Sequence, residues 1–266
     1  MTPDASWSLE PSVLFLVALG AVVYAIRWRA VRRSGLARAT PGWRAVVFAA
    51  GLVAVLAALV SPVDRLGDQL LVMHMVQHLL LLDVAPVLLI LGLTKLILRP
   101  ATRRLVALER AAGPLAHPGF AVAFYVVAMW TWHVPALYDA AEHNAAVHVL
   151  EHLCFAAAGG LYWWHLLSPI RGRSGLRGMG PAVYMASTKV LVGVLGIALA
   201  FAPATFYPFY AHQPHYWGLS PHDDQAAAGM VMALEQSLVM GAALAILFVR
   251  ALAESERQEQ RAERLA

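Results

Sequence analysis

Seven runs of apolar residues alternate with short polar segments along the chain. At 1.5 Å per residue, each run is close to or above the length that crosses about 30 Å of hydrocarbon as a helix. The pattern therefore predicts an all-α fold: a polytopic membrane bundle of about seven transmembrane helices. The runs cover residues 11–26, 43–61, 70–93, 119–138, 145–167, 181–202 and 225–250.

Charged residues sort into alternate connections. Lys and Arg gather after the first, third and fifth runs, at Arg27–Arg44, Lys95–Arg110 and Arg171–Arg177, and in the tail from Arg250. Cytoplasmic connections of membrane proteins carry this basic excess. The sequence thus predicts an N-terminus outside and a cytoplasmic C-terminus. The other connections are poor in Lys and Arg and carry the acidic residues Asp64, Asp68, Asp139, Glu142, Asp223 and Asp224.

Composition supports lipid as the solvent and limits the domain organisation. The chain is 60% hydrophobic and only 14% charged, whereas soluble domains carry roughly 25% charged residues. We expect one transmembrane domain over residues 1–266, with a short outer N-terminus (1–10) and a cytoplasmic tail (251–266). The net charge of +4 comes from the connections between spans, so we predict a lipid bilayer and no nucleic acid as partner.

Histidine is distributed asymmetrically. With this topology, nine of the eleven histidines lie toward the outer side, and only His117 and His165 lie toward the inner side. Two patterns repeat, His74-x-x-Gln77-His78 and His148-x-x-Glu151-His152. Residues four apart share a helix face, so each helix presents two imidazoles together. Gln77 and Glu151 flank those faces and are candidates to orient an imidazole or to join the ligands.

These pairs favour a metal site. A single intramembrane histidine is more often an interhelical hydrogen-bonding contact, but two pairs at one depth, with His133 as a fifth candidate, favour metal or haem. Imidazole suits copper, zinc and iron, and thioether or thiol groups shift the preference toward Cu(I). By helical angle, Met73, Met75 and Cys154 point away from the histidine face. The loop residues His143, His212, His215 and His222 are interpreted as solvated.

Further polar groups interrupt the apolar runs. Asp83 and Lys189 lie at similar depths, so we predict a buried charge pair between them. Asp224 stands at the start of the last run, where it is predicted either to cap that helix or to offer a carboxylate to the histidines. Residues 203–225 form an aromatic outer connection that is interpreted as an interfacial lid.

The motifs resemble one known family. His74-x3-His78 is followed by Pro86 and Gly92, then by Trp132-His133-x-Pro135-x-x-Tyr138 and His148-x-x-Glu151-His152. Trp163-Trp164 with Pro169 and Asp224-Gln225-x3-Gly229-x-x-Met232 complete the set. In this order they resemble the multi-helix CtaG family of cytochrome c oxidase assembly proteins over roughly residues 60 to 250. Thr94 and Ala233 depart from the family's usual proline and tryptophan.

The resemblance implies a factor of the bacterial plasma membrane, multi-pass, that helps to make a haem-copper oxidase, with oxidase subunits as partners. Together with the histidines it predicts a non-enzymatic protein that binds copper at the outer face and passes it on. Two alternatives remain open at this point. One is a helix-bundle redox protein with haem between facing histidines. The other is an intramembrane metalloprotease, because His148-x-x-Glu151-His152 matches the inverted zincin pattern.

Overall fold

The protein is described by a computed structural model covering residues 2–170, 176 and 178–264. Over these residues the regular structure is helical, with no strand. The longer helices are α1 (Pro11–Arg33), α2 (Trp43–Leu59), α4 (Leu71–Leu79), α5 (Ala85–Gly92), α7 (Thr102–Ala112), α8 (Pro118–Trp132), α9 (Pro135–His143), α10 (Ala145–Leu167), α11 (Gly180–Ala200), α13 (Pro221–Glu235) and α14 (Gly241–Glu263). Short helices connect them: α3 (Pro62–Gly67), α6 (Lys95–Leu98) and α12 (Pro208–Ala211).

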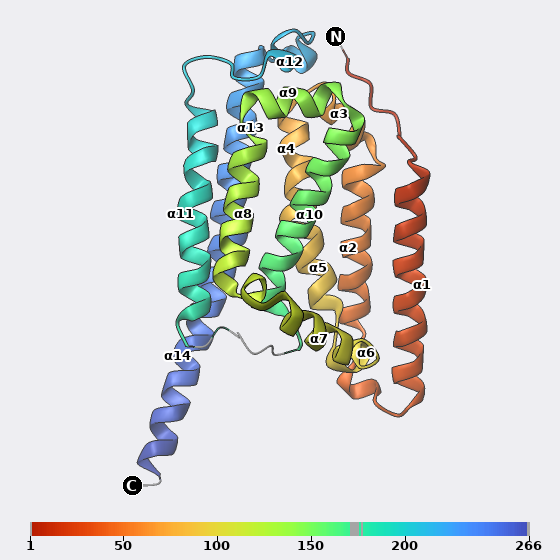
Figure 1. Ribbon diagram of the computed structural model, residues 1–266, viewed down its shortest axis with the longest axis vertical. Coiled ribbons are helices and arrows are strands. Elements are labelled where there is room, and N and C mark those ends of the chain that lie inside the picture. Colours follow the sequence, from red (N-terminus) through yellow and green to blue (C-terminus); the bar gives the residue numbers. More distant parts are fainter. Residues whose placement is uncertain (1, 171–175, 177, 265–266) are drawn as a thin grey trace.

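The long helices run side by side and form a bundle, with α1 at one edge and α14 extending beyond it (Figure 1). Among the described residues, four helices are long and apolar enough to cross a membrane: α1, α4–α5, α10 and α11. The bent pair α7 and α8 counts as a fifth if it forms one span, and α2 is apolar but shorter. The all-α prediction is confirmed and the four or five candidate spans are consistent with a membrane bundle, while seven crossings and their orientation remain a prediction.

The connections divide between the two ends of the bundle. The N-terminus, α3, α9 and α12 lie at one end, and α6, α7 and the C-terminus lie at the other (Figure 1). This is the division that the charge pattern predicts. The basic positions Arg171, Arg173 and Arg177 lie outside the described residues. For brevity, the end with α3, α9 and α12 is called the α9 end.

We expect the α9 end to face away from the cytoplasm, because the opposite end carries the basic connections. A reporter fused after Gln213 is expected to read non-cytoplasmic, and the same reporter after Arg173 is expected to read cytoplasmic. Activity of a cytoplasm-dependent and a periplasm-dependent reporter at both positions measures this directly. The reversed readout would place the histidines on the cytoplasmic side and contradict the predicted orientation.

The fourth predicted run is shorter than the sequence indicates. It was expected to reach residue 138, but α8 ends at Trp132 and a separate helix, α9, begins at Pro135. Proline lacks an amide hydrogen and disfavours helical geometry in the residue before it, and Val134 is extended. The chain therefore turns here, and α9 lies across the end of the bundle (Figure 1).

Helix α10 packs closely against the segment that joins α4 to α5. A π-helical turn (Leu80–Val84) joins α4 to α5, and Gly159 of α10 packs against the backbone of Leu82 so closely that a Cβ would overlap its carbonyl. A second π-helical turn (Gln236–Met240) joins α13 to α14. Such turns occur often at functional sites in helices.

The predicted charge pair between Asp83 and Lys189 is wrong. Asp83 is fully buried and accepts hydrogen bonds from the Tyr125 hydroxyl at 2.8 Å and the Trp163 indole at 2.7 Å. The Lys189 amine instead lies against Gly241, and no ion pair joins it to Asp83 within the described part of the chain. The prediction rested on the similar depth of the two residues in the membrane, but their side chains contact different neighbours.

Replacing Tyr125 with phenylalanine is therefore expected to destabilise the bundle by about 1–3 kcal/mol, because Asp83 loses a buried hydrogen-bond donor. Lys189→Met is the matched comparison and is expected to change the free energy of unfolding by less than about 0.5 kcal/mol. Denaturant unfolding of the purified chain in detergent measures both. A larger loss for Lys189→Met than for Tyr125→Phe would restore the ion-pair interpretation.

Candidate metal centre

The start of α4 is fixed by a residue from another helix. Both carboxylate oxygens of Asp224, in the first turn of α13, accept backbone N–H groups of α4, from Leu71 at 2.7 Å and Val72 at 3.0 Å. Unsatisfied amides at a helix N-terminus favour such a carboxylate. Both predicted roles of Asp224 are therefore wrong: Ser220 caps α13, and Asp224 is committed to α4, where it positions the helix that carries His74 and His78.

The two histidine pairs face each other inside the bundle. The ring centroids of His74 and His148 are 5.4 Å apart and stacked, and those of His78 and His152 are 5.6 Å apart. Within α4, His74 and His78 are in edge contact at 4.2 Å. His74 is completely buried and His78 nearly so. Both α4 and α10 thus direct their imidazoles into one place near the α9 end.

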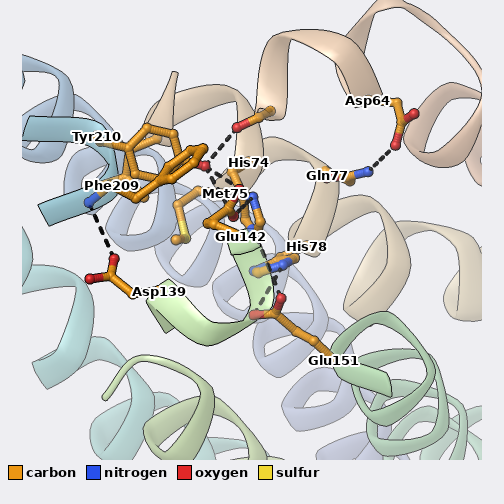
Figure 2. A network of polar contacts seen from close by, with 12 residues as sticks. Asp64, His74, Met75, Gln77, His78, Asp139, Glu142, Glu151, Phe209 and Tyr210 are labelled. Atoms are coloured by element: carbon orange, nitrogen blue, oxygen red, sulfur yellow. Dashed lines mark hydrogen bonds and ion pairs between the residues drawn. The ribbon is translucent and has the colours of Figure 1, made fainter. Parts of the chain in front are cut away.

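Helix α9 supplies a carboxylate to this cluster. Glu142 Oε1 lies 3.0 Å from His74 Nδ1, as Figure 2 shows. The Tyr210 hydroxyl donates to the Gly67 carbonyl at 2.6 Å and lies 3.2 Å from the same imidazole nitrogen. A carboxylate that accepts the Nδ1 proton fixes the tautomer of a histidine and leaves Nε2 as a lone pair. His74 Nε2 is therefore the atom available to a metal.

Glu151 lies between the two histidines of α4. Its carboxylate oxygens are 3.9 Å from His74 Nε2 and 3.6 Å from His78 Nε2, both beyond hydrogen-bonding distance. The residue is fully buried, and neither oxygen has a hydrogen-bond partner in the part of the chain described. A buried carboxylate is costly unless it is paired with a cation, a metal or a proton. Its position among imidazoles fits a metal ligand.

The imidazoles around Glu151 also have buried polar atoms without hydrogen-bond partners. Within the described ranges, these buried nitrogens have no hydrogen-bond partner: His74 Nε2, both nitrogens of His78, His148 Nε2 and His152 Nε2. Buried polar atoms are otherwise almost always satisfied. One ligand atom from each of His74, His78 and His152 lies within 4.8 Å of the others. Two nitrogens bound to one zinc ion at 2.0–2.1 Å are at most about 4 Å apart, so small ring rotations would bring them into range.

A second group overlaps the first and consists of His74, Glu142 and His148, with ligand atoms again within 4.8 Å. Using His74 Nδ1 as a ligand there would break its contact with Glu142. The group of His74, His78 and His152 needs no such loss. The geometry therefore favours that group as the ligands, with Glu142 as the residue that orients His74.

Gln77 lies outside the cluster. Its amide donates to the Ala58 carbonyl at 2.9 Å and to Asp64 Oδ1 at 2.8 Å, and Figure 2 shows it directed away from His74. The prediction that Gln77 orients an imidazole or ligates the metal is therefore wrong. Its two hydrogen bonds tie α4 to α2 and α3 and direct the amide away from the imidazoles.

His133, the fifth candidate, lies at the edge of the cluster. As the last residue before the turn into α9, it places Nδ1 2.7 Å from the Met129 carbonyl and Nε2 3.4 Å from Met75 Sδ. Its ring centroid is 6.5 Å from that of His78.

The solvated-loop interpretation fits His143 and His212, which are exposed and whose Nδ1 atoms contact backbone carbonyls.

Three residues near the cluster were not predicted as part of it. Glu142 was counted only as an outer charge, although the proline at the start of α9 places Tyr138 and Glu142 one turn apart on one face. Met75 was interpreted as turned away, yet it is three residues before His78 and so only about 60° from it. Tyr210 belongs to the aromatic connection that is interpreted as an interfacial lid, but its side chain is buried.

Two tyrosines of the connection between α11 and α13 form hydrogen bonds with residues around the cluster. The Tyr207 hydroxyl donates to the His133 carbonyl at 3.1 Å, and Tyr210 contacts Gly67 and His74 as described. Asp68, the residue after Gly67, lies at the same end of the bundle. Partial burial raises the pKa of its carboxyl group to about 6, and the nearby carboxylates of Glu142 and Asp64 add to that shift. Acidic side chains therefore gather at the α9 end, where a cation would approach.

The fold and the cluster together define a class: a helical membrane protein with buried imidazoles and carboxylates near one end. The chain belongs to the family of cytochrome c oxidase caa3 assembly factors (CtaG), whose model matches residues 22–254 of the 266. The match includes the whole cluster and confirms the family resemblance of the sequence motifs. No match was found among curated proteins or among solved structures. Family membership indicates a cytochrome c oxidase assembly factor.

Proposed function

We propose that this protein binds copper at the histidine cluster and passes it to a cytochrome c oxidase during assembly, without turning over a substrate. The ligands would be His74, His78 and His152 with Glu151, and His148 would be a further ligand. The observation that carries the proposal is the set of buried, unpaired imidazole nitrogens around the unpaired carboxylate of Glu151. Such atoms are expected where they coordinate a cation.

The donor set leaves copper, zinc and iron as candidates, since imidazole suits all three. Copper is proposed because the chain belongs to a family of oxidase assembly factors and haem-copper oxidases require that metal. Haem fits less well. In a bis-histidine haem two imidazoles point their nitrogens at the iron from opposite faces of the macrocycle, whereas the His74 and His148 rings are stacked on each other and the His74 and His78 rings are in edge contact.

Transfer also requires access. The cluster would face the outer side of a bacterial plasma membrane, below the connection pinned by Tyr207 and Tyr210. Opening that connection would expose His74 first, because Tyr210 contacts its ring. Oxidase subunits would receive the ion there, and the acidic residues at this end would attract a cation from solution.

A cell-based experiment tests the proposal. In a strain lacking the gene, the wild-type chain is expected to restore active oxidase, and His78→Ala is expected to fail at similar protein abundance. His143→Ala is the matched control, because His143 lies at the same end, is exposed, and places its ring against the Asp139 carbonyl and Phe209 rather than in the cluster. Oxidase activity and copper content are measured in isolated membranes. Full restoration by His78→Ala would overturn the copper proposal, whereas the family assignment would stand.

A further inference from the structure

The contact between His133 and Met75 has an unusual arrangement of lone pairs. His133 Nδ1 lies 2.7 Å from the Met129 carbonyl, which cannot donate, so Nδ1 carries the hydrogen. His133 is buried and has no carboxylate contact among the described residues, so a charged imidazolium would be costly. The ring is therefore neutral, and its Nε2 lone pair faces the Met75 thioether at 3.4 Å.

The 3.4 Å between His133 Nε2 and Met75 Sδ is close to the separation of two ligand atoms that are bound to the same metal ion. Bonds of about 2.0 Å to nitrogen and about 2.3 Å to sulfur place the two ligand atoms about 3.5 Å apart at a tetrahedral angle. The hydrogen bond from Nδ1 to a backbone carbonyl is the arrangement that metal-binding histidines use to fix tautomer and orientation. His78 is the nearest further ligand, because both of its nitrogens are unpaired and its ring is 6.5 Å from His133.

We propose that Met75, His133 and His78 form a second position, specific for Cu(I), beside the position of His74, His152 and Glu151. This inference rests on the proposed copper function and deepens it. The two positions would share His78 but differ in chemistry. A thioether with imidazoles selects Cu(I), whereas the carboxylate of Glu151 also accepts harder ions such as Zn²⁺.

A shared ligand gives the ion a route between the positions. Copper could exchange its other ligands one at a time while it stays bound to His78, so it would not need to leave the protein. Met75 is buried against the cluster, so its sulfur is held in place for this contact. The thioether position would thus be selective for the reduced ion, and zinc would bind only at the position that contains Glu151.

X-ray absorption at the copper edge of the purified full-length chain, loaded with Cu(I), tests this. A sulfur neighbour at about 2.3 Å is expected in the wild type. Met75→Leu, which nearly preserves side-chain volume, is expected to lose that neighbour and to weaken Cu(I) binding at least about tenfold, with Zn²⁺ binding unchanged. Met73→Leu, on the same helix, is the matched control and is expected to keep the sulfur signal.

The outcomes separate the two proposals. Copper bound by nitrogen and oxygen alone in the wild type would overturn the thioether position and leave the copper function intact. Retention of no copper by a folded wild-type chain would overturn both. If Met75→Leu fails to fold, selenomethionine-labelled wild-type protein supplies the second measurement. A copper neighbour at the selenium edge supports the position, and no such neighbour overturns it.

Discussion

Replacing His74 with alanine is expected to weaken copper binding by more than about 100-fold. Loss of an outer-shell partner alone costs about 10–100-fold, and His74 is proposed as a direct ligand. Its ring also contacts His78, His148 and Glu142, so its removal disturbs the whole cluster. Titration of the purified chain with Cu(I) against a competing chelator measures the dissociation constant.

The same substitution is expected to leave the metal-free protein folded but less stable. Truncating the buried ring leaves a cavity and removes the contact of Nδ1 with Glu142, while the loss of the unpaired Nε2 atom offsets part of that cost. The melting temperature of the metal-free variant is therefore expected to be moderately below that of the wild type. His143→Ala serves as the control for affinity. If His143→Ala and His74→Ala had equal dissociation constants, the cluster would not be the copper site.

Replacing Gly159 with alanine is expected to destabilise the bundle by about 1–3 kcal/mol or more, because its methyl group would overlap the backbone of Leu82. Backbone at a helix crossing cannot move aside as a flexible side chain can. Gly159 lies two turns from His152, and Leu82 lies one turn from His78, so separating the helices here would also pull the histidine pairs apart. Weaker copper binding is expected to accompany the lower melting temperature.

The neighbouring Gly160→Ala is the control. Apart from the backbone of its own helix, no atom of the described residues lies within 4 Å of a Cβ at that position, so alanine is expected to stabilise the helix by up to about 1 kcal/mol through its higher helix propensity. Thermal unfolding and copper titration of both variants give the comparison. A similar loss in both would show that helix geometry, and not the contact with Leu82, is the cause.

The helices were largely predictable from sequence because lipid imposes a simple rule. A span must satisfy its backbone internally and present apolar side chains, so the runs alone locate α1, α4–α5, α10 and α11. The run over 145–167 coincides with α10. The break after His133 was missed because Trp132 to Tyr138 is apolar enough to continue a span, although Pro135 marks the turn.

The cluster was predictable only as far as one helix at a time. Spacing of four places His74 beside His78 and His148 beside His152, whatever the tertiary fold. The identity of a partner on another helix depends on rotation about each helix axis, which depth along the membrane does not specify. This is why Asp83 was paired with Lys189, why Asp224 was given to its own helix, and why Glu142 and Met75 were not placed at the cluster.

The most direct test of the central claim is the copper content of the purified full-length chain. After loading with Cu(I) under reducing conditions and removal of excess metal, we expect at least one copper per chain, with imidazole nitrogens at about 2.0 Å in the absorption spectrum. His74→Ala, folded to the same extent by circular dichroism, is expected to retain far less. A folded wild-type chain that retains no more copper than His74→Ala would contradict the account.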